Sequence, residues 1–160
     1  MNNSLKFERY IEDFINLHRL FEKKYRYLLA WSGGLDSTVL FHLLLKMKDF
    51  QFEVIHFNHG IRAEAYKEEN EIVRLCQQYQ IHCHVFHLNL NKHQSNFEFV
   101  ARNNRKGLYQ KFITDGYKII EAHHLDDSFE WSLIQKFKQG SLDQTLGIPI
   151  HSKNIVRPLM

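Results

Sequence analysis

Six residues near the start of the chain combine glycines, hydroxyl groups and a carboxylate between two apolar runs. They are Ser32, Gly33, Gly34, Leu35, Asp36 and Ser37. The preceding apolar run has the length of a buried strand, and the apolar spacing that follows is helical. The N–H groups of such a turn and the positive end of the helix point to one place, which favours a phosphate group. Because glycine permits close approach of the backbone, the stretch predicts a phosphate-binding loop.

Asp36 is a negative charge beside the predicted phosphate. A carboxylate at this position becomes favourable if Mg²⁺ lies between it and the phosphate, since this hard cation takes oxygen ligands from both groups. The stretch lacks the lysine of a Walker A loop and the third glycine of a dinucleotide-binding fingerprint. The alternative is an ordinary helix start, in which Gly33 and Gly34 make a tight turn and Asp36 interacts with the helix dipole.

A second polar group lies at another predicted junction of strand and helix, in the sequence AHHLDDSFE of residues 122–130. Asp127 and Glu130 are three residues apart, so they share one face of a helix, and His124 lies one turn earlier. Because both junctions fall at the carboxyl edge of the predicted sheet, we expect Asp36 and Asp127 to share one pocket around a Mg²⁺ ion. The alternative is helix capping by an aspartate at the N-cap and a glutamate at N3.

The rest of the sequence alternates between extended and helical apolar periods. Strands are predicted over 25–31, 52–57, 81–88, 118–122 and 154–156. Helices are predicted over 7–21, 37–48, 72–79, from a capping box of Ser95 and Glu98 to Phe112, and over 127–138. Such alternation requires crossovers between parallel strands, so it predicts an α/β fold with a doubly wound, mostly parallel sheet and helices on both faces.

Length and composition limit the number of domains and the class of protein. The 160 residues, 44% of them hydrophobic, predict one domain over 1–160, with a helix in 1–24 packed on it. The formal charge of +3 suits an anionic partner without requiring one. Only two cysteines are present, and no apolar run approaches the ~18 residues of a membrane span. We therefore expect a soluble, cytoplasmic protein with no membrane segment.

In this setting, SGGLDS resembles the pyrophosphate loop (PP-loop) of the N-type ATP pyrophosphatases, which have an adenine nucleotide alpha hydrolase-like fold. Within that superfamily the sequence is most similar to the tRNA(Ile)-lysidine synthetase family. The matching motifs follow in order as 32–37, 58–62, Ala101-Arg102 with Arg105, 123–130, Gly140-Ser141 and Arg157-Pro158-Leu159. The sequence departs from the family at Asn58, where Asp is usual, at Lys106, where Tyr is common, and at Trp131, where Thr is usual. The family usually continues past the position of Met160, so the resemblance implies a domain shortened at its C-terminus.

The resemblance implies an ATP-dependent ligase that modifies the wobble cytidine of an isoleucine tRNA with a CAU anticodon. ATP adenylates the C2 oxygen and releases pyrophosphate; free lysine then attacks C2 and expels AMP. The implied catalytic residues are Asp36, Arg102, His123, His124, Asp127 and Glu130. Residues 32–37 would bind ATP, and Asp36 and Glu130 would bind Mg²⁺. The identity of the general base stays open, as does the oligomeric state.

Two other functions are consistent with these residues. One is a different adenylating PP-loop enzyme, amidating or thiolating, and the other is an inactive ATP- or RNA-binding module. The thiolating relatives that use paired cysteines are disfavoured, because Cys76 and Cys83 do not form a C-x-x-C pair. Strand alternation also places Cys83 on the side opposite His82 and His84, which argues against a metal site in this segment.

Overall fold

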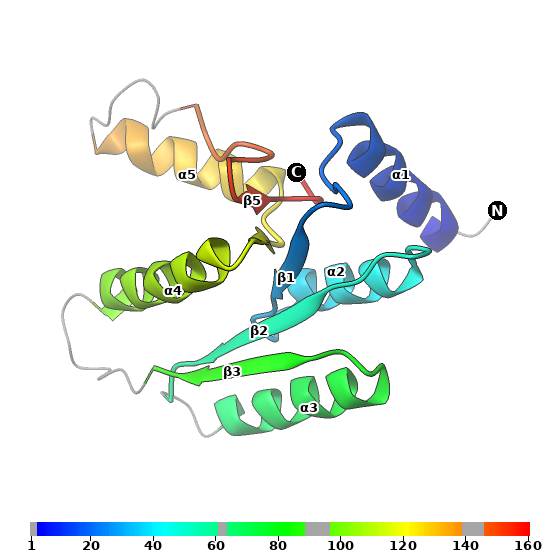
Figure 1. Cartoon of the computed structure of the whole chain (residues 1–160). Coiled ribbons are helices and arrows are strands. Elements are labelled where there is room, and N and C mark those ends of the chain that lie inside the picture. The colour runs from blue at the N-terminus through cyan, green and yellow to red at the C-terminus, as the bar shows by residue number, and fades with distance from the viewer. Residues whose placement is uncertain (1–2, 61–63, 89–96, 139–145) are drawn as a thin grey trace.

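A single parallel sheet forms the centre of the protein. The computed structural model describes residues 3–60, 64–88, 97–138 and 146–160 (Figure 1). The strands are β1 (Arg26–Ala30), β2 (Glu53–Asn58), β3 (Cys83–His87), β4 (Tyr117–Ile120) and β5 (Ile155–Val156). They are arranged in the order β3-β2-β1-β4-β5, and every neighbouring pair is parallel. The predicted α/β fold with a doubly wound parallel sheet is therefore confirmed.

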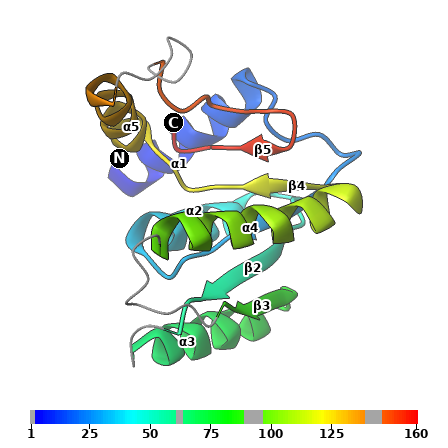
Figure 2. The same ribbon diagram turned by 90° about the vertical axis from the view of Figure 1, so that its left-hand side faces the viewer.

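Five helices connect the described strands or precede them. They are α1 (Asn3–Leu17), α2 (Leu35–Lys46), α3 (Glu64–Gln78), α4 (Phe97–Thr114) and α5 (Leu125–Phe137). The chain moves from β1 through β2 to the edge strand β3, then returns across the sheet to β4. Right-handed crossovers that reverse direction in this way place their helices on opposite faces. Figure 2 accordingly shows α4 in front of the sheet and α2 behind it.

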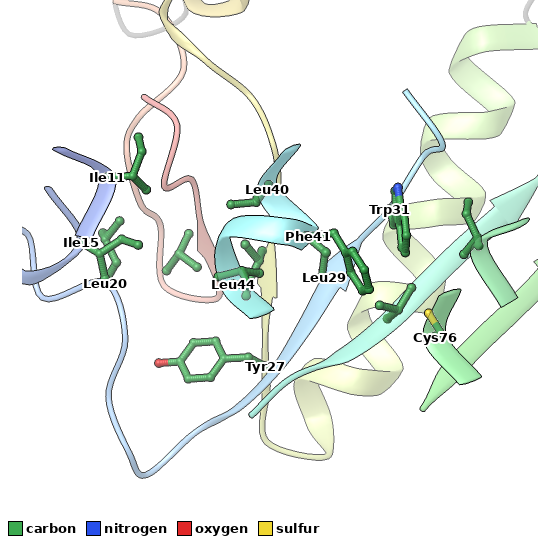
Figure 3. Close-up of a cluster of buried hydrophobic side chains, with 14 residues drawn as sticks. Ile11, Ile15, Leu20, Tyr27, Leu29, Trp31, Leu40, Phe41, Leu44 and Cys76 are labelled. Carbon is green, nitrogen blue, oxygen red and sulfur yellow. The ribbon is translucent and has the colours of Figure 1, made fainter. Parts of the chain in front are cut away.

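The larger hydrophobic core lies between the sheet and helices α1 to α3. Leu40, Phe41 and Leu44 of α2 are fully buried against Leu29 of β1 (Figure 3). Helix α1 adds Ile11 and Ile15, and α3 adds Ile72 and Cys76. A smaller core on the other face joins α4 to the sheet, with buried residues Leu28, Ile55, Tyr109, Tyr117 and Ile119. Apolar side chains on both faces of β1 make it the central, fully covered strand.

Most predicted elements are present with shifted ends. The first helix ends at Leu17 rather than continuing to Phe21, because Arg19 adopts a positive φ of 48°. Helices α2 and α5 each begin two residues earlier than predicted, at Leu35 and Leu125. The predicted start at Ser95 lies outside the described residues. No helix of the described ranges is both long and apolar enough to span a membrane.

Candidate active site at the carboxyl edge of the sheet

The predicted phosphate loop follows β1 and is anchored by a buried tryptophan. Trp31 stacks on Phe41 of α2 with ring centroids 4.0 Å apart, and its Nε1 donates to Thr38 Oγ1 at 3.0 Å. His56 of the neighbouring strand lies 2.8 Å through Nδ1 from the Trp31 carbonyl oxygen. Contacts with α2 on one side and with β2 on the other therefore fix the chain at Trp31, directly before the loop.

The loop backbone leaves the start of α2 accessible to an anion. Gly33 has a φ of +86°, a conformation that a side chain would strain, and Gly34 is the N-cap without any side-chain capping bond. The two serine hydroxyls lie 3.0 Å apart, and the Gly34 N–H donates weakly to Ser32 Oγ at 3.3 Å. The first N–H groups of an α-helix have no intrahelical acceptor, so an uncapped start of this kind suits a phosphate.

Helix α5 starts on the opposite side of the same edge. His124 is its N-cap, and the His124 N–H donates to Asp127 Oδ2 at 2.9 Å in a capping box. The capping alternative is thus present, but with His124 at the N-cap and Asp127 at N3 rather than an aspartate and a glutamate. Capping fixes the Asp127 carboxylate at the edge of the sheet while leaving one oxygen for other partners.

The loop before α2 and the start of α5 meet at His124. Its Nε2 atom lies 3.8 Å from Asp36 Oδ2 and 3.7 Å from Asp127 Oδ2. Asp36 and Asp127 also line one cavity of about 220 Å³. The described residues lining it are Ala30, Ser32, Gly34, Asp36, Ser37, Arg105, Tyr109, Glu121, Ala122, His123 and Asp127. Parallel strands with sequential crossovers bring these residues together, although about ninety positions separate the two carboxylates in the chain.

Two predicted site residues lie away from this cavity. Glu130 is exposed on the next turn of α5, and Arg102 is exposed on α4. The Arg102 guanidinium lies 5.0 Å from the centre of the Trp131 ring, a cation–π contact that holds it against α5. Neither belongs to the described lining of the cavity. Their roles in metal binding and catalysis stay predictions.

A buried ion pair behind the cavity was not predicted from the sequence. Arg157 Nη2 lies 2.8 Å from Glu121 Oε2, and Arg157 Nη1 donates to the Pro149 carbonyl at 2.8 Å. His123 Nδ1 is 3.2 Å from the same Glu121 oxygen. Burial alone would raise the pKa of Glu121, but His123 and Arg157 outweigh it and hold this pKa below its ordinary value. Glu121 is thus a charged group beside His123.

Tyr109 is a second lining residue that the sequence did not single out. It is buried on α4, and burial together with the charge of Glu121 raises the pKa of its hydroxyl. Tyr109 therefore stays a neutral hydroxyl at the back of the cavity. Its position in the apolar spacing of a helix marks it as a core residue, so only the fold reveals its polar end.

Asn58, one of the departures from the family that the sequence resembles, lies at the end of β2, and its contacts explain why an amide suits this position. Its side chain is buried, and Nδ2 donates to Glu69 Oε2 at 2.6 Å while Oδ1 accepts from the Gly60 N–H at 2.8 Å. Glu69 also pairs with His87 at 2.8 Å. An aspartate at this position would place two carboxylates in contact, so the amide suits its neighbour on α3.

Replacing Asn58 with aspartate is expected to lower the free energy of unfolding by about 1–3 kcal/mol at pH 7, because a buried donor is lost and two carboxylates meet. The loss should shrink as the pH falls toward the carboxyl pKa, where one group becomes protonated and donates to the other. Urea denaturation at several pH values would measure this. Combining Asn58→Asp with Glu69→Gln is the control, since it restores a donor; a deficit equal at all pH values would contradict the explanation.

Comparisons with known proteins identify the family of the chain. The PP-loop domain family matches residues 3–160. A tRNA(Ile)-lysidine synthase of Campylobacter jejuni is 36% identical over 144 residues, which cover 86% of this chain and 44% of that protein. A tRNA(Ile)-lysidine synthase of Wolinella succinogenes is 36% identical over 138 residues, covering 82% of this chain and 41% of that protein. The chain therefore spans less than half the length of these curated relatives.

Solved structures show the same fold at lower identity. The U34-tRNA thiolase NcsA from Methanococcus maripaludis, solved with its 4Fe-4S cluster, matches with a TM-score of 0.72 and 19% identity, covering 96% of this chain and 58% of that chain. An NH3-dependent NAD synthetase from Campylobacter jejuni matches with a TM-score of 0.60 and 17% identity, covering 81% of this chain and 60% of that chain. At these identities the likeness concerns the fold alone.

Proposed function

Because the chain belongs to the PP-loop domain family, which matches residues 3–160, we propose that it binds ATP at the loop of residues 32–37 and serves in tRNA(Ile)-lysidine synthesis. The proposed reaction adenylates the wobble cytidine of an isoleucine tRNA with a CAU anticodon and then joins free lysine to C2. One observation carries the proposal. Asp36 beside the phosphate loop and Asp127 at the start of α5 both lie within 4 Å of His124.

The first step requires stabilisation of departing pyrophosphate. The N–H groups at the uncapped start of α2 would donate to phosphate oxygens, and Arg105, which lines the same cavity, would add a positive charge. The carboxylate oxygens of Asp36 and Asp127 are donors of the kind that Mg²⁺ prefers, and Glu130 is a further proposed ligand from the next turn of α5. When bound, Mg²⁺ would neutralise charge on the leaving group.

The second step requires a neutral lysine amine. Asp127 or His124 would accept a proton from the lysine ammonium group, since both lie at the start of α5 beside the cavity. His123 lies beside Glu121, which is paired with Arg157. Arg102, stacked on Trp131, is placed outside the cavity, where its guanidinium could contact a phosphate or a carboxylate of a larger substrate.

The decisive test is ATP-dependent incorporation of radiolabelled lysine into isoleucine tRNA bearing a CAU anticodon, together with ATP–pyrophosphate exchange with and without that tRNA. We expect exchange to depend on the tRNA and lysine to become attached to it. The same tRNA with a CAU-to-GAU change at the wobble base is the control, because it lacks the cytidine. Exchange that ignores tRNA and responds to ammonia would indicate an amidating enzyme. ATP binding without any exchange would indicate a binding module.

A further inference from the structure

A cluster of two histidines and a glutamate lies at the edge of the sheet opposite Asp36. Glu53 is the first residue of β2, His82 directly precedes β3, and His84 is the second residue of β3. The register pairs Val54 with Cys83 and Ile55 with His84. Side chains alternate along strands, so Glu53, His82 and His84 project from the same face. Strand alternation predicted correctly that Cys83 points to the side opposite the two histidines. The sequence alone could not show that Glu53 joins them from the neighbouring strand.

The distances in this cluster suit a single metal ion. One carboxylate oxygen of Glu53 and one ring nitrogen from each histidine lie within 4.8 Å of one another. His84 Nε2 is 2.7 Å from Glu53 Oε2, and the two imidazole rings are 4.3 Å apart at an angle of 77°. Ligand atoms about 2.0–2.2 Å from a tetrahedral ion lie roughly 3–4 Å apart. The 2.7 Å contact between His84 and Glu53 is shorter than this spacing, so a bound ion would require these two side chains to move apart, while the exposed His82 has room to turn toward the ion.

Neighbouring residues already hold two of these ligands in place. Glu53 Oε1 accepts from the Tyr117 hydroxyl at 2.6 Å and from Arg26 Nη2 at 3.0 Å, which directs Oε2 toward His84. Burial and the bond to Glu53 raise the pKa of Tyr117 to about 12, so it remains a donor at neutral pH. The His84 ring also packs on Phe112 of α4 at 4.8 Å. Supporting bonds of this kind orient ligands in protein metal sites.

We propose that Glu53, His82 and His84 bind a Zn²⁺ ion. Two imidazole nitrogens and one carboxylate oxygen are a ligand set that zinc takes, whereas Mg²⁺ and Ca²⁺ prefer oxygen ligands alone. The three residues line a cavity of about 900 Å³, which leaves room for a water molecule as the fourth ligand. The Arg26 charge on the other carboxylate oxygen weakens the attraction of Glu53 for a cation. The site is independent of the proposed ATP chemistry.

The test is calorimetric titration of the 160-residue chain with Zn²⁺. We expect one saturable site, and we expect His82→Ala and His84→Ala each to weaken binding by more than about tenfold. Tyr117→Phe, which removes a donor that positions Glu53, should weaken it less. Because His82 is exposed, His82→Ala should keep the melting temperature of the metal-free protein. Co²⁺ in place of Zn²⁺ should show the visible absorption of a tetrahedral ion in the parent chain and lose it in both histidine variants.

His87→Ala is the matched control, since His87 is on the same strand but pairs with Glu69 on the other face. It should bind Zn²⁺ as the parent does. A double variant of His82→Ala and His84→Ala that retains the parent stoichiometry and affinity would overturn the proposal, and so would a parent chain that shows no saturable Zn²⁺ binding. Loss of binding in His87→Ala alone would indicate that the metal binds at the Glu69–His87 pair instead. That result would also overturn the proposal.

Discussion

Asp36→Asn is expected to slow ATP–pyrophosphate exchange by about 100- to 1000-fold, the range seen when a charge-stabilising group is removed from an active site. Asparagine keeps the size of the side chain and loses only its charge. Asp36 lies in the first turn of α2 beside the phosphate loop and faces His124. Its carboxylate is the proposed Mg²⁺ ligand that belongs to the phosphate loop itself. The substitution should therefore lower mainly the rate of exchange and affect ATP affinity much less.

Asp115→Asn is the matched control for this experiment. Asp115 is an exposed aspartate in the turn before β4, remote from the lining of the cavity. We expect it to exchange pyrophosphate at the parent rate. An exchange rate for Asp36→Asn within about threefold of the parent rate would contradict the assignment of Asp36. Removal of a metal ligand, or of a group that stabilises developing charge, has a much larger effect. Asp127→Asn tested in parallel should also be slow if both carboxylates serve the same leaving group.

Arg157→Leu is expected to lower the free energy of unfolding by about 3–5 kcal/mol, the usual effect of leaving one partner of a buried ion pair uncompensated. Arg157 and Glu121 expose only 10% and 16% of their side chains. Leucine removes both the charge opposite Glu121 and the hydrogen bond to the Pro149 carbonyl. Urea denaturation at pH 7 measures the change. Arg74→Leu is the control, because the Arg74–Glu71 pair is exposed and should contribute less than about 1 kcal/mol.

The pH dependence of Arg157→Leu gives a second, independent readout. In the parent, the pKa of Glu121 is lowered, so its contribution to stability is present above the ordinary carboxyl pKa of about 4.3 and is lost as the pH falls through the lower value. In the variant, burial acts on Glu121 without Arg157, so the deficit should be largest at neutral pH and should shrink as Glu121 becomes protonated. Adding Glu121→Gln should restore part of the stability. A deficit that ignores both pH and Glu121→Gln would show that only the lost packing matters.

Much of the architecture could be predicted because it depends on local patterns. The apolar run before Ser32 and the helical spacing after it place a turn between a strand and a helix, and the alternation of such units leads to a parallel sheet. Helix ends were less predictable. Helix α5 begins at Leu125 because the His124 N–H bonds to Asp127, a choice of cap that several adjacent polar residues could have made.

The sequence by itself determined that the residues of the phosphate loop and of the HHLDD segment lie at carboxyl ends of strands, since turn chemistry and periodicity are encoded within a few residues. Only the tertiary structure decided which distant side chains meet. The crossover order sets Asp36 beside His124, and the register of β2 and β3 sets Glu53 beside His82 and His84. The pairing of Glu121 with Arg157 likewise depends on β5 lying next to β4. Strand order and register are set by packing of the whole core, which no short stretch of sequence contains.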